Sequence, residues 1–204
     1  MKRGKFIVIE GGVGCGKSTQ AKMLVEKFGF TLFREPGGTE FGELVREVLQ
    51  ERHDLKINRL ASLLGYMTCR ANLINEEILP RLKNGENILL DRYWFSSEAY
   101  QGAEGVSRKE IRNIAKFATN GLMPNLVLFY DLDPVIGQER KNLKKQRQDR
   151  YDLKNPEFHN KIRKIYHNIG KRLNKIWVNI DANDSIENIF DKSVDILKKR
   201  MLVK

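Results

Sequence analysis

The segment 5–20, KFIVIEGGVGCGKSTQ, constrains the fold more than any other part of this chain. An apolar run at 6–9 leads into a glycine-rich loop at 11–16, and Lys17 then opens a stretch with helical spacing. This order predicts a buried strand, a loop whose backbone N–H groups turn toward phosphate, and a helix whose N-terminus adds partial positive charge. The spacing G-x-x-x-x-G-K-S therefore indicates a P-loop for a nucleoside triphosphate.

Two side chains of this loop have distinct chemical roles. Lys17 is expected to reach the β- and γ-phosphates, and the hydroxyl of Ser18 is expected to bind Mg²⁺. Cys15 is interpreted as a small side chain that fits inside the loop. The residues expected to contact the triphosphate are Gly11, Gly12, Val13, Gly14, Cys15, Gly16, Lys17, Ser18 and Thr19.

Apolar segments of strand length alternate with helical patterns over the rest of the chain. Alternation of this kind predicts parallel βαβ units with right-handed crossovers and helices on both faces of the sheet. We therefore expect an α/β fold of three layers around a five-stranded parallel sheet, in one domain over residues 1–204. Strands are expected at 6–9, 31–34, 87–90, 126–130 and 176–180, and helices at 17–28, 40–51, 58–84, 107–120, 156–174 and 184–201, with a further basic helical segment from Pro134.

The chain carries a formal net charge of +11, from 37 Lys and Arg against 26 Asp and Glu. Three explanations stay open: nucleic-acid binding, attraction of small phosphorylated substrates, or a lysine-rich solvated surface. A run of about 20 apolar residues is absent, so we expect no association with a membrane. The two cysteines have no paired spacing, which favours a reducing compartment and a cytoplasmic protein. The three histidines lack metal-ligand spacing and are expected at the surface.

Other features narrow the class of P-loop protein. The guanine-binding sequence N-K-x-D is absent, and motor proteins and helicases are normally longer than 204 residues. Arginines follow several strands, and a basic helical segment comes late in the chain. An enzyme that joins two phosphate groups needs cations on both sides of the γ-phosphoryl group and a cover that excludes water. We therefore predict a kinase that acts on a small acceptor.

Five motifs carry a resemblance to a known family. They are Glu10-Gly11 in front of the P-loop, the sequences REPGGT (34–39), DRY (91–93) and AYQG (99–102), and a second DRY (149–151) after the basic stretch. Their order and spacing resemble the bacterial-type thymidylate kinases, which are P-loop nucleoside monophosphate kinases. The resemblance implies ATP-dependent phosphorylation of dTMP to dTDP in dTTP biosynthesis, by direct in-line transfer with Mg²⁺. It also implies a homodimer, for which the helix expected at 58–84 is a candidate seam, and no stable nucleic-acid partner.

The resemblance further implies roles around the phosphates. Lys17 and Ser18 would bind ATP and Mg²⁺. Asp91, which ends an apolar Ile-Leu-Leu run, would help to place Mg²⁺. Arg46 and Arg92 would hold the phosphate of dTMP through charge-assisted hydrogen bonds.

On the acceptor side, the resemblance implies contacts with the base and the sugar. Arg70 and Gln101 would read the edge of thymine, with Ser97 nearby. Tyr66 would stack on the base, and Tyr100 would disfavour a ribose 2′-OH.

Two carboxylates are also expected to contact the substrate. Glu35 would line the same pocket and orient Arg92. Val13 occupies a position where the family usually has an acid that meets the sugar 3′-OH or the metal shell. Glu10 is expected to cover part of that role.

The basic segment at about 134–152 resembles the mobile lid of the family. In the bacterial type, a lid arginine replaces one that other members carry in the P-loop, where this chain has Gly14. The candidates are Arg140, Arg147 and Arg150, because a guanidinium group can bridge two phosphate oxygens.

Other functions stay open beside this one. A deoxynucleoside kinase or a relaxed pyrimidine monophosphate kinase would use the same chemistry. A nucleoside acceptor calls for a carboxylate base near its 5′-hydroxyl, for which Glu35 is a candidate, whereas Arg46 and Arg92 favour a monophosphate. A P-loop ATPase that binds nucleic acid would explain the charge of +11. DNA or RNA would stimulate such an ATPase, whereas a kinase needs a nucleotide acceptor.

Overall fold

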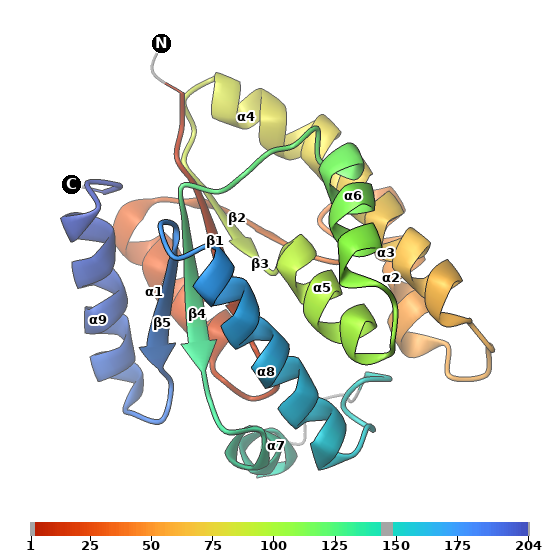
Figure 1. Cartoon of the computed structure of the whole chain (residues 1–204). Helices are drawn as coiled ribbons and strands as arrows, with labels where there is room; N and C mark the ends of the chain where they lie inside the picture. Colours follow the sequence, from red (N-terminus) through yellow and green to blue (C-terminus); the bar gives the residue numbers. More distant parts are fainter. Residues whose placement is uncertain (1–2, 144–148, 204) are drawn as a thin grey trace.

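The computed structural model describes residues 3–143 and 149–203, and it contains a sheet of five parallel strands (Figure 1). The strands follow the order β2-β3-β1-β4-β5. The predicted five-stranded parallel sheet is therefore confirmed, and each expected strand is found within two residues of its expected ends. The bounds are β1 (Phe6–Gly11), β2 (Thr31–Arg34), β3 (Ile88–Asp91), β4 (Leu126–Asp131) and β5 (Trp177–Asp181).

Helices cover both faces of this sheet. Successive residues of β1 point to opposite faces: Phe6 and Val8 belong to the larger apolar core, and Ile7 and Ile9 to the smaller one. Figure 1 shows α1 and α9 on one side of the sheet and α5, α6 and α8 on the other. The helices are α1 (Lys17–Phe28), α2 (Glu40–Arg46), α3 (Arg59–Leu73), α4 (Leu79–Lys83), α5 (Trp94–Ala103), α6 (Arg108–Ala118), α7 (Pro134–Leu143), α8 (Pro156–Arg172) and α9 (Ile186–Lys199), with π-helical turns η1 (Glu47–Glu51) and η2 (Ile74–Ile78).

The helix α5 is absent from the sequence prediction because it has no apolar stripe. It packs against α3, α6 and α8, so side chains are buried around much of its circumference. Among them, Glu98 is fully buried and pairs with Arg112 of α6 and Arg172 of α8. The buried positions of α5 thus include a charged residue. For this reason, apolar residues alone do not repeat with the period of a helix along this segment.

Two expected helices are each interrupted by a π-helical turn. The helix expected at 58–84 is α3, η2 and α4 in succession, and the one expected at 40–51 is α2 followed by η1. A π turn adds one residue to a turn, which apolar spacing of three and four does not reveal. Pro80 lies in the first turn of α4, where its missing N–H group is tolerated.

The parallel arrangement brings the carboxyl ends of all the strands to one edge. The chain leaves β1 at this edge through the P-loop. The strands β2 and β3 lie on one side of β1, and β4 and β5 lie on the other, so the strand order reverses direction at β1. Ligands bind at such a switch point in open α/β sheets. No helix in residues 3–143 and 149–203 has both the length and the apolar character needed to cross a membrane.

Candidate functional site

A cleft of about 620 Å³ lies at this edge of the sheet, a usual size for a ligand pocket. Glu10, Gly11 and Arg150 do not line it, and Arg147 lies outside the described residues. The predicted site residues that line it are Gly12, Val13, Gly14, Cys15, Gly16, Lys17, Ser18, Thr19, Glu35, Arg46, Tyr66, Arg70, Asp91, Arg92, Ser97, Tyr100, Gln101 and Arg140.

The P-loop holds Lys17 at its centre. Gly16, with φ +86°, turns the chain into α1 in a conformation that favours glycine. The Nζ of Lys17 donates to the carbonyl oxygens of Gly11 and Gly12, each at 3.2 Å. Cys15 is buried against Gly11, as expected for a small side chain that fills the loop. The ammonium group therefore lies at the loop that is predicted to bind phosphate.

Ser18 and Asp91 approach each other across the cleft floor. Ser18 Oγ donates to Asp91 Oδ2 at 3.3 Å. The second oxygen, Asp91 Oδ1, is buried and accepts no hydrogen bond from any residue in the described part of the chain. Mg²⁺ prefers oxygen ligands and keeps several waters, so a hydroxyl and a carboxylate with a spare acceptor fit this ion.

Arg92 is held rigidly at the end of β3. Its backbone has φ +72°, a left-handed conformation that is uncommon for a residue other than glycine. Its Nη1 donates to the carbonyl oxygen of Gly11 at 3.2 Å and to Ser96 Oγ at 3.0 Å. Its Nη2 donates to the hydroxyl of Tyr100 at 3.4 Å, and its Cζ lies 5.2 Å from the centre of that ring. The guanidinium group is thus fixed at the wall of the cleft.

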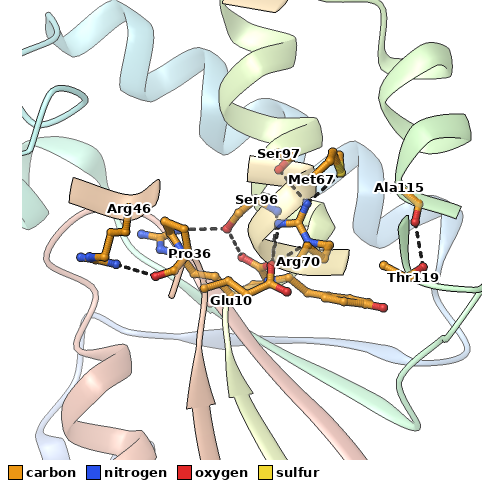
Figure 2. Close-up of polar contacts among 12 residues, drawn as sticks. Glu10, Pro36, Arg46, Met67, Arg70, Ser96, Ser97, Ala115 and Thr119 are labelled. Carbon is orange, nitrogen blue, oxygen red and sulfur yellow. Dashed lines mark hydrogen bonds and ion pairs between the residues drawn. The ribbon is translucent and has the colours of Figure 1, made fainter. Parts of the chain in front are cut away.

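Glu10 supports Arg92 from behind. It is fully buried, and its carboxylate accepts hydrogen bonds from the N–H and Oγ of Ser96 at 3.2 and 2.7 Å (Figure 2). It also accepts from the N–H of Tyr93 at 2.8 Å and from the hydroxyl of Tyr166 at 2.9 Å. These N–H groups open α5, so Glu10 caps that helix. Burial raises the pKa of Glu10, and the charge of Arg92 opposes this rise. Contrary to the expectation of a substrate contact, Glu10 faces α5 and not the cleft.

Arg70 and Glu35 form a buried ion pair beside this network. The Nε of Arg70 lies 2.6 Å from Oε2 of Glu35, and its Nη1 donates to Ser97 Oγ at 3.2 Å (Figure 2). Burial raises the pKa of Glu35 to about 7, against the lowering effect of Arg70. Glu35 lines the cleft as predicted, but it orients Arg70 and not Arg92. The contact between Arg70 and Glu35 joins residues 35 positions apart, so their spacing in the sequence does not reveal it.

Two further parts of the predicted acceptor site lie nearby. The Nη1 of Arg46 donates to the carbonyl oxygen of Pro36 at 2.9 Å (Figure 2). Gln101 donates from Nε2 to the hydroxyl of Tyr151 at 2.7 Å. Tyr66 and Tyr151 are buried in one small apolar cluster. The residues predicted to read and stack on a base therefore lie along the same cleft as the phosphate-binding groups.

Helix α7 lies directly against the P-loop. A side chain on Gly14 would overlap the carbonyl oxygen of Gly137 in α7, and one on Gly137 would overlap that of Val13. Arg140, on α7, lines the cleft and donates from Nη1 to a carbonyl oxygen just after β5 at 3.0 Å. Lys141, which was not predicted, lines it too and pairs with Asp152.

Sequence reasoning missed Tyr166 and His159, both on α8. The hydroxyl of Tyr166 donates to Glu10 Oε2 at 2.9 Å and lies 2.9 Å from Ser96 Oγ. Its spacing on the apolar face of α8 marks it only as a core residue. His159 was expected at the surface but is buried and lines the cleft. The start of α9 also lines the cleft, and no signal in the sequence distinguishes it from an ordinary helix cap.

Known proteins match this chain over most of its length. The model of the family described as thymidylate kinase matches residues 9–192. The thymidylate kinase of Thermoanaerobacter sp. (strain X514) is 36% identical over 203 residues, covering 97% of this chain and 98% of the relative. That of Caldanaerobacter subterraneus subsp. tengcongensis is 40% identical over 190 residues, covering 90% of each chain. That of Geobacillus thermodenitrificans is 35% identical over 205 residues, covering 97% and 91%. The chain therefore belongs to the thymidylate kinase family.

Proposed function

We propose that one set of residues in the cleft binds ATP and another binds dTMP, in this enzyme's ATP-dependent phosphorylation of dTMP to dTDP. One observation carries the proposal. Lys17 Nζ and Arg92 Nη1 each lie 3.2 Å from the same carbonyl oxygen, that of Gly11. Two cations held this close repel each other unless anions lie beside them. Such a pair suits two phosphate groups that meet at this point.

On the donor side, the P-loop N–H groups and Lys17 bind the β- and γ-phosphates of ATP. Ser18 and Asp91 would hold Mg²⁺, and the ion would neutralise charge on the phosphate oxygens. Arg140 is the lid cation that the described structure favours, because it lines the cleft, while Arg147 and Arg150 stay candidates. We further propose that 134–152 is the lid of one kinase domain over residues 1–204.

On the acceptor side, Arg92 and Arg46 hold the phosphate of dTMP through charge-assisted hydrogen bonds. Arg70 and Gln101 contact the thymine edge, and Tyr66 lies against the base. Tyr100 lies beside the sugar. The acceptor phosphate is already an anion at neutral pH, so the transfer needs neither a covalent intermediate nor a strong base. Alignment of the two phosphates and cancellation of their charge supply the catalysis.

We also propose a homodimer, formed through neighbouring faces of α2, α3 and α6. These helices expose large apolar side chains, among them Leu44 (62% exposed), Leu64 (47%) and Phe117 (88%). Large exposed apolar patches mark interfaces. Sedimentation of the Leu64→Asp variant should show a monomer, whereas Met201→Asp, at an exposed site elsewhere, should keep the wild-type mass.

A cytoplasmic location fits the two free cysteines, Cys15 and Cys69, which a reducing compartment would preserve. Cell fractionation with an antibody against the chain would test this location.

Turnover with a panel of nucleoside monophosphates tests the proposed function. With ATP and Mg²⁺, ADP formation should depend on the acceptor and be fastest with dTMP. Deoxythymidine, dCMP and UMP separate the nucleoside kinase and the relaxed pyrimidine kinase from this enzyme. ADP formation that needs DNA or RNA and ignores dTMP would contradict the proposal and favour a nucleic-acid-binding ATPase.

A further inference from the structure

The side chain of Gln101 is held by a short chain of hydrogen bonds that runs through Tyr151, which also lines the cleft, to Glu104, which does not. Its Nε2 donates to the hydroxyl of Tyr151 at 2.7 Å, and that hydroxyl donates to Oε2 of Glu104 at 3.5 Å. Gln101 and Tyr151 are both buried, whereas Glu104 is half-buried just after α5. None of these contacts involves the P-loop or the phosphate-binding arginines.

The chemistry of these groups fixes the direction of each hydrogen bond. An ionised carboxylate can only accept, so Glu104 takes the single proton of the Tyr151 hydroxyl. The oxygen of the Tyr151 hydroxyl can then only accept a hydrogen bond from Gln101. The amide must therefore turn its NH₂ group toward Tyr151. Its carbonyl oxygen, Oε1, has no hydrogen bond to another residue in 3–143 or 149–203, and Gln101 lines the cleft.

We propose that Tyr151, oriented by Glu104, is a positioning residue that sets which bases the acceptor site admits. This inference rests on the proposed acceptor site, in which Gln101 meets the base. By holding the amide NH₂ group, Tyr151 leaves the amide oxygen as the group that the base meets.

The neighbouring Arg70 makes this orientation selective. Its guanidinium group carries only donors and is held in place by Glu35 and Ser97. The cleft therefore presents a donor from Arg70 beside an acceptor from Gln101. Thymine and uracil carry O4 and N3–H side by side, an acceptor and a donor, which match this pair. Cytosine carries a 4-amino group and an unprotonated N3, so it opposes donor to donor and acceptor to acceptor.

Kinetics of the Tyr151→Phe variant with dTMP and dCMP test this inference. The variant keeps the ring but frees the amide to rotate, so the ratio of kcat/KM for dTMP to that for dCMP should fall about tenfold, the effect of one misdirected hydrogen bond. The fall should come from a higher KM for dTMP, with kcat within about twofold of wild type, because base contacts form in ground and transition states alike. Burial raises the pKa of Glu104, so the assay is run at pH 8 to keep its carboxylate ionised.

Two further variants keep the test sharp. In Glu104→Gln, an amide can donate to the hydroxyl and reverse the chain, so the ratio should fall in the same direction by a smaller factor. Tyr130→Phe removes another buried hydroxyl, bonded to Ser193 at 3.1 Å and outside the cleft, and should leave the ratio unchanged. Glu104→Gln carries the test alone if Tyr151→Phe does not fold.

The outcomes separate this inference from the proposed function. A wild-type enzyme that prefers dTMP, with an unchanged ratio in Tyr151→Phe or, if that variant does not fold, in Glu104→Gln, would overturn the positioning role only. Equal losses of kcat with both substrates would do the same, because they indicate a structural role. A wild-type enzyme that does not use dTMP would overturn the proposed acceptor site itself, and the inference with it.

Discussion

Replacing Arg92 by alanine should affect catalysis and stability separately. We expect kcat/KM for dTMP to fall by about 2–4 kcal/mol of transition-state binding, on the order of 30- to 1000-fold, because a buried charged contact with the acceptor phosphate is lost. Alanine and arginine have similar backbone strain at φ +72°. The substitution therefore tests the loss of the guanidinium group and not a change in strain.

The loss of stability comes from Glu10. Without Arg92, its carboxylate stays fully buried with no countercharge nearby, although its hydrogen bonds to Tyr93, Ser96 and Tyr166 remain. Arg92 reaches Glu10 through Ser96 Oγ, and the other hydrogen bonds of Glu10 survive, so the uncompensated buried carboxylate should cost about 1–3 kcal/mol. The double variant Glu10→Gln/Arg92→Ala removes the orphaned charge and should recover part of that stability without recovering activity.

Two measurements separate these effects. A coupled assay of ADP formation, with dTMP varied at saturating ATP, gives kcat/KM, and urea unfolding gives the free energy of unfolding. Arg163→Ala serves as the matched control, because Arg163 pairs with Asp131 outside the cleft. An Arg92→Ala enzyme within about threefold of wild type would show that the acceptor phosphate lies elsewhere. Recovery of activity in the double variant would show that the single variant fails by unfolding.

Three other changes have expected outcomes. Tyr100→Phe should narrow the preference for dTMP over its ribose analogue about fivefold, and an unchanged ratio would remove Tyr100 from the sugar site. Asp91→Asn should raise the Mg²⁺ concentration for half-maximal activity about 10- to 100-fold, and a curve like that of wild type would place the metal elsewhere. Burial raises the pKa of Glu35 from 4.5 to about 7, so its contribution to stability is complete below pH 4.5 and is lost as the pH rises through about 7. In the wild type, the free energy of unfolding should therefore fall between pH 4.5 and about 7, and Glu35→Gln should remove up to about 3 kcal/mol of this fall. Urea unfolding at several pH values measures it. The same dependence on pH in both proteins would argue against a raised pKa of Glu35.

The sequence predicts those parts of the fold and site that depend on local order. Apolar runs and the P-loop spacing predict the parallel sheet, because its three central strands, β1, β3 and β4, are buried on both faces. The motif residues that follow different strands, such as Lys17, Glu35 and Arg92, meet in one cleft because parallel strands share a carboxyl edge.

The contacts behind the cleft could not be predicted in the same way. Glu10 and Glu35 are both acids near Arg92, and spacing along the chain does not say which of them faces α5 and which pairs with Arg70. Tyr166 lies 156 residues from Glu10, and only the packing of α8 onto the sheet beside α5 brings them together. Helix α5 itself is hidden because its neighbours bury it on several sides.

The contact between Gly14 and Gly137 affects how this enzyme can evolve. Neither residue has room for a side chain, so a mutation that places arginine at position 14 would force α7 off the loop. With the proposed phosphate-binding cation Arg140 on α7, a lineage with this glycine pair cannot move that cation into the loop by a single codon change. Helix α7 would first have to move away from the loop to make room for the larger side chain.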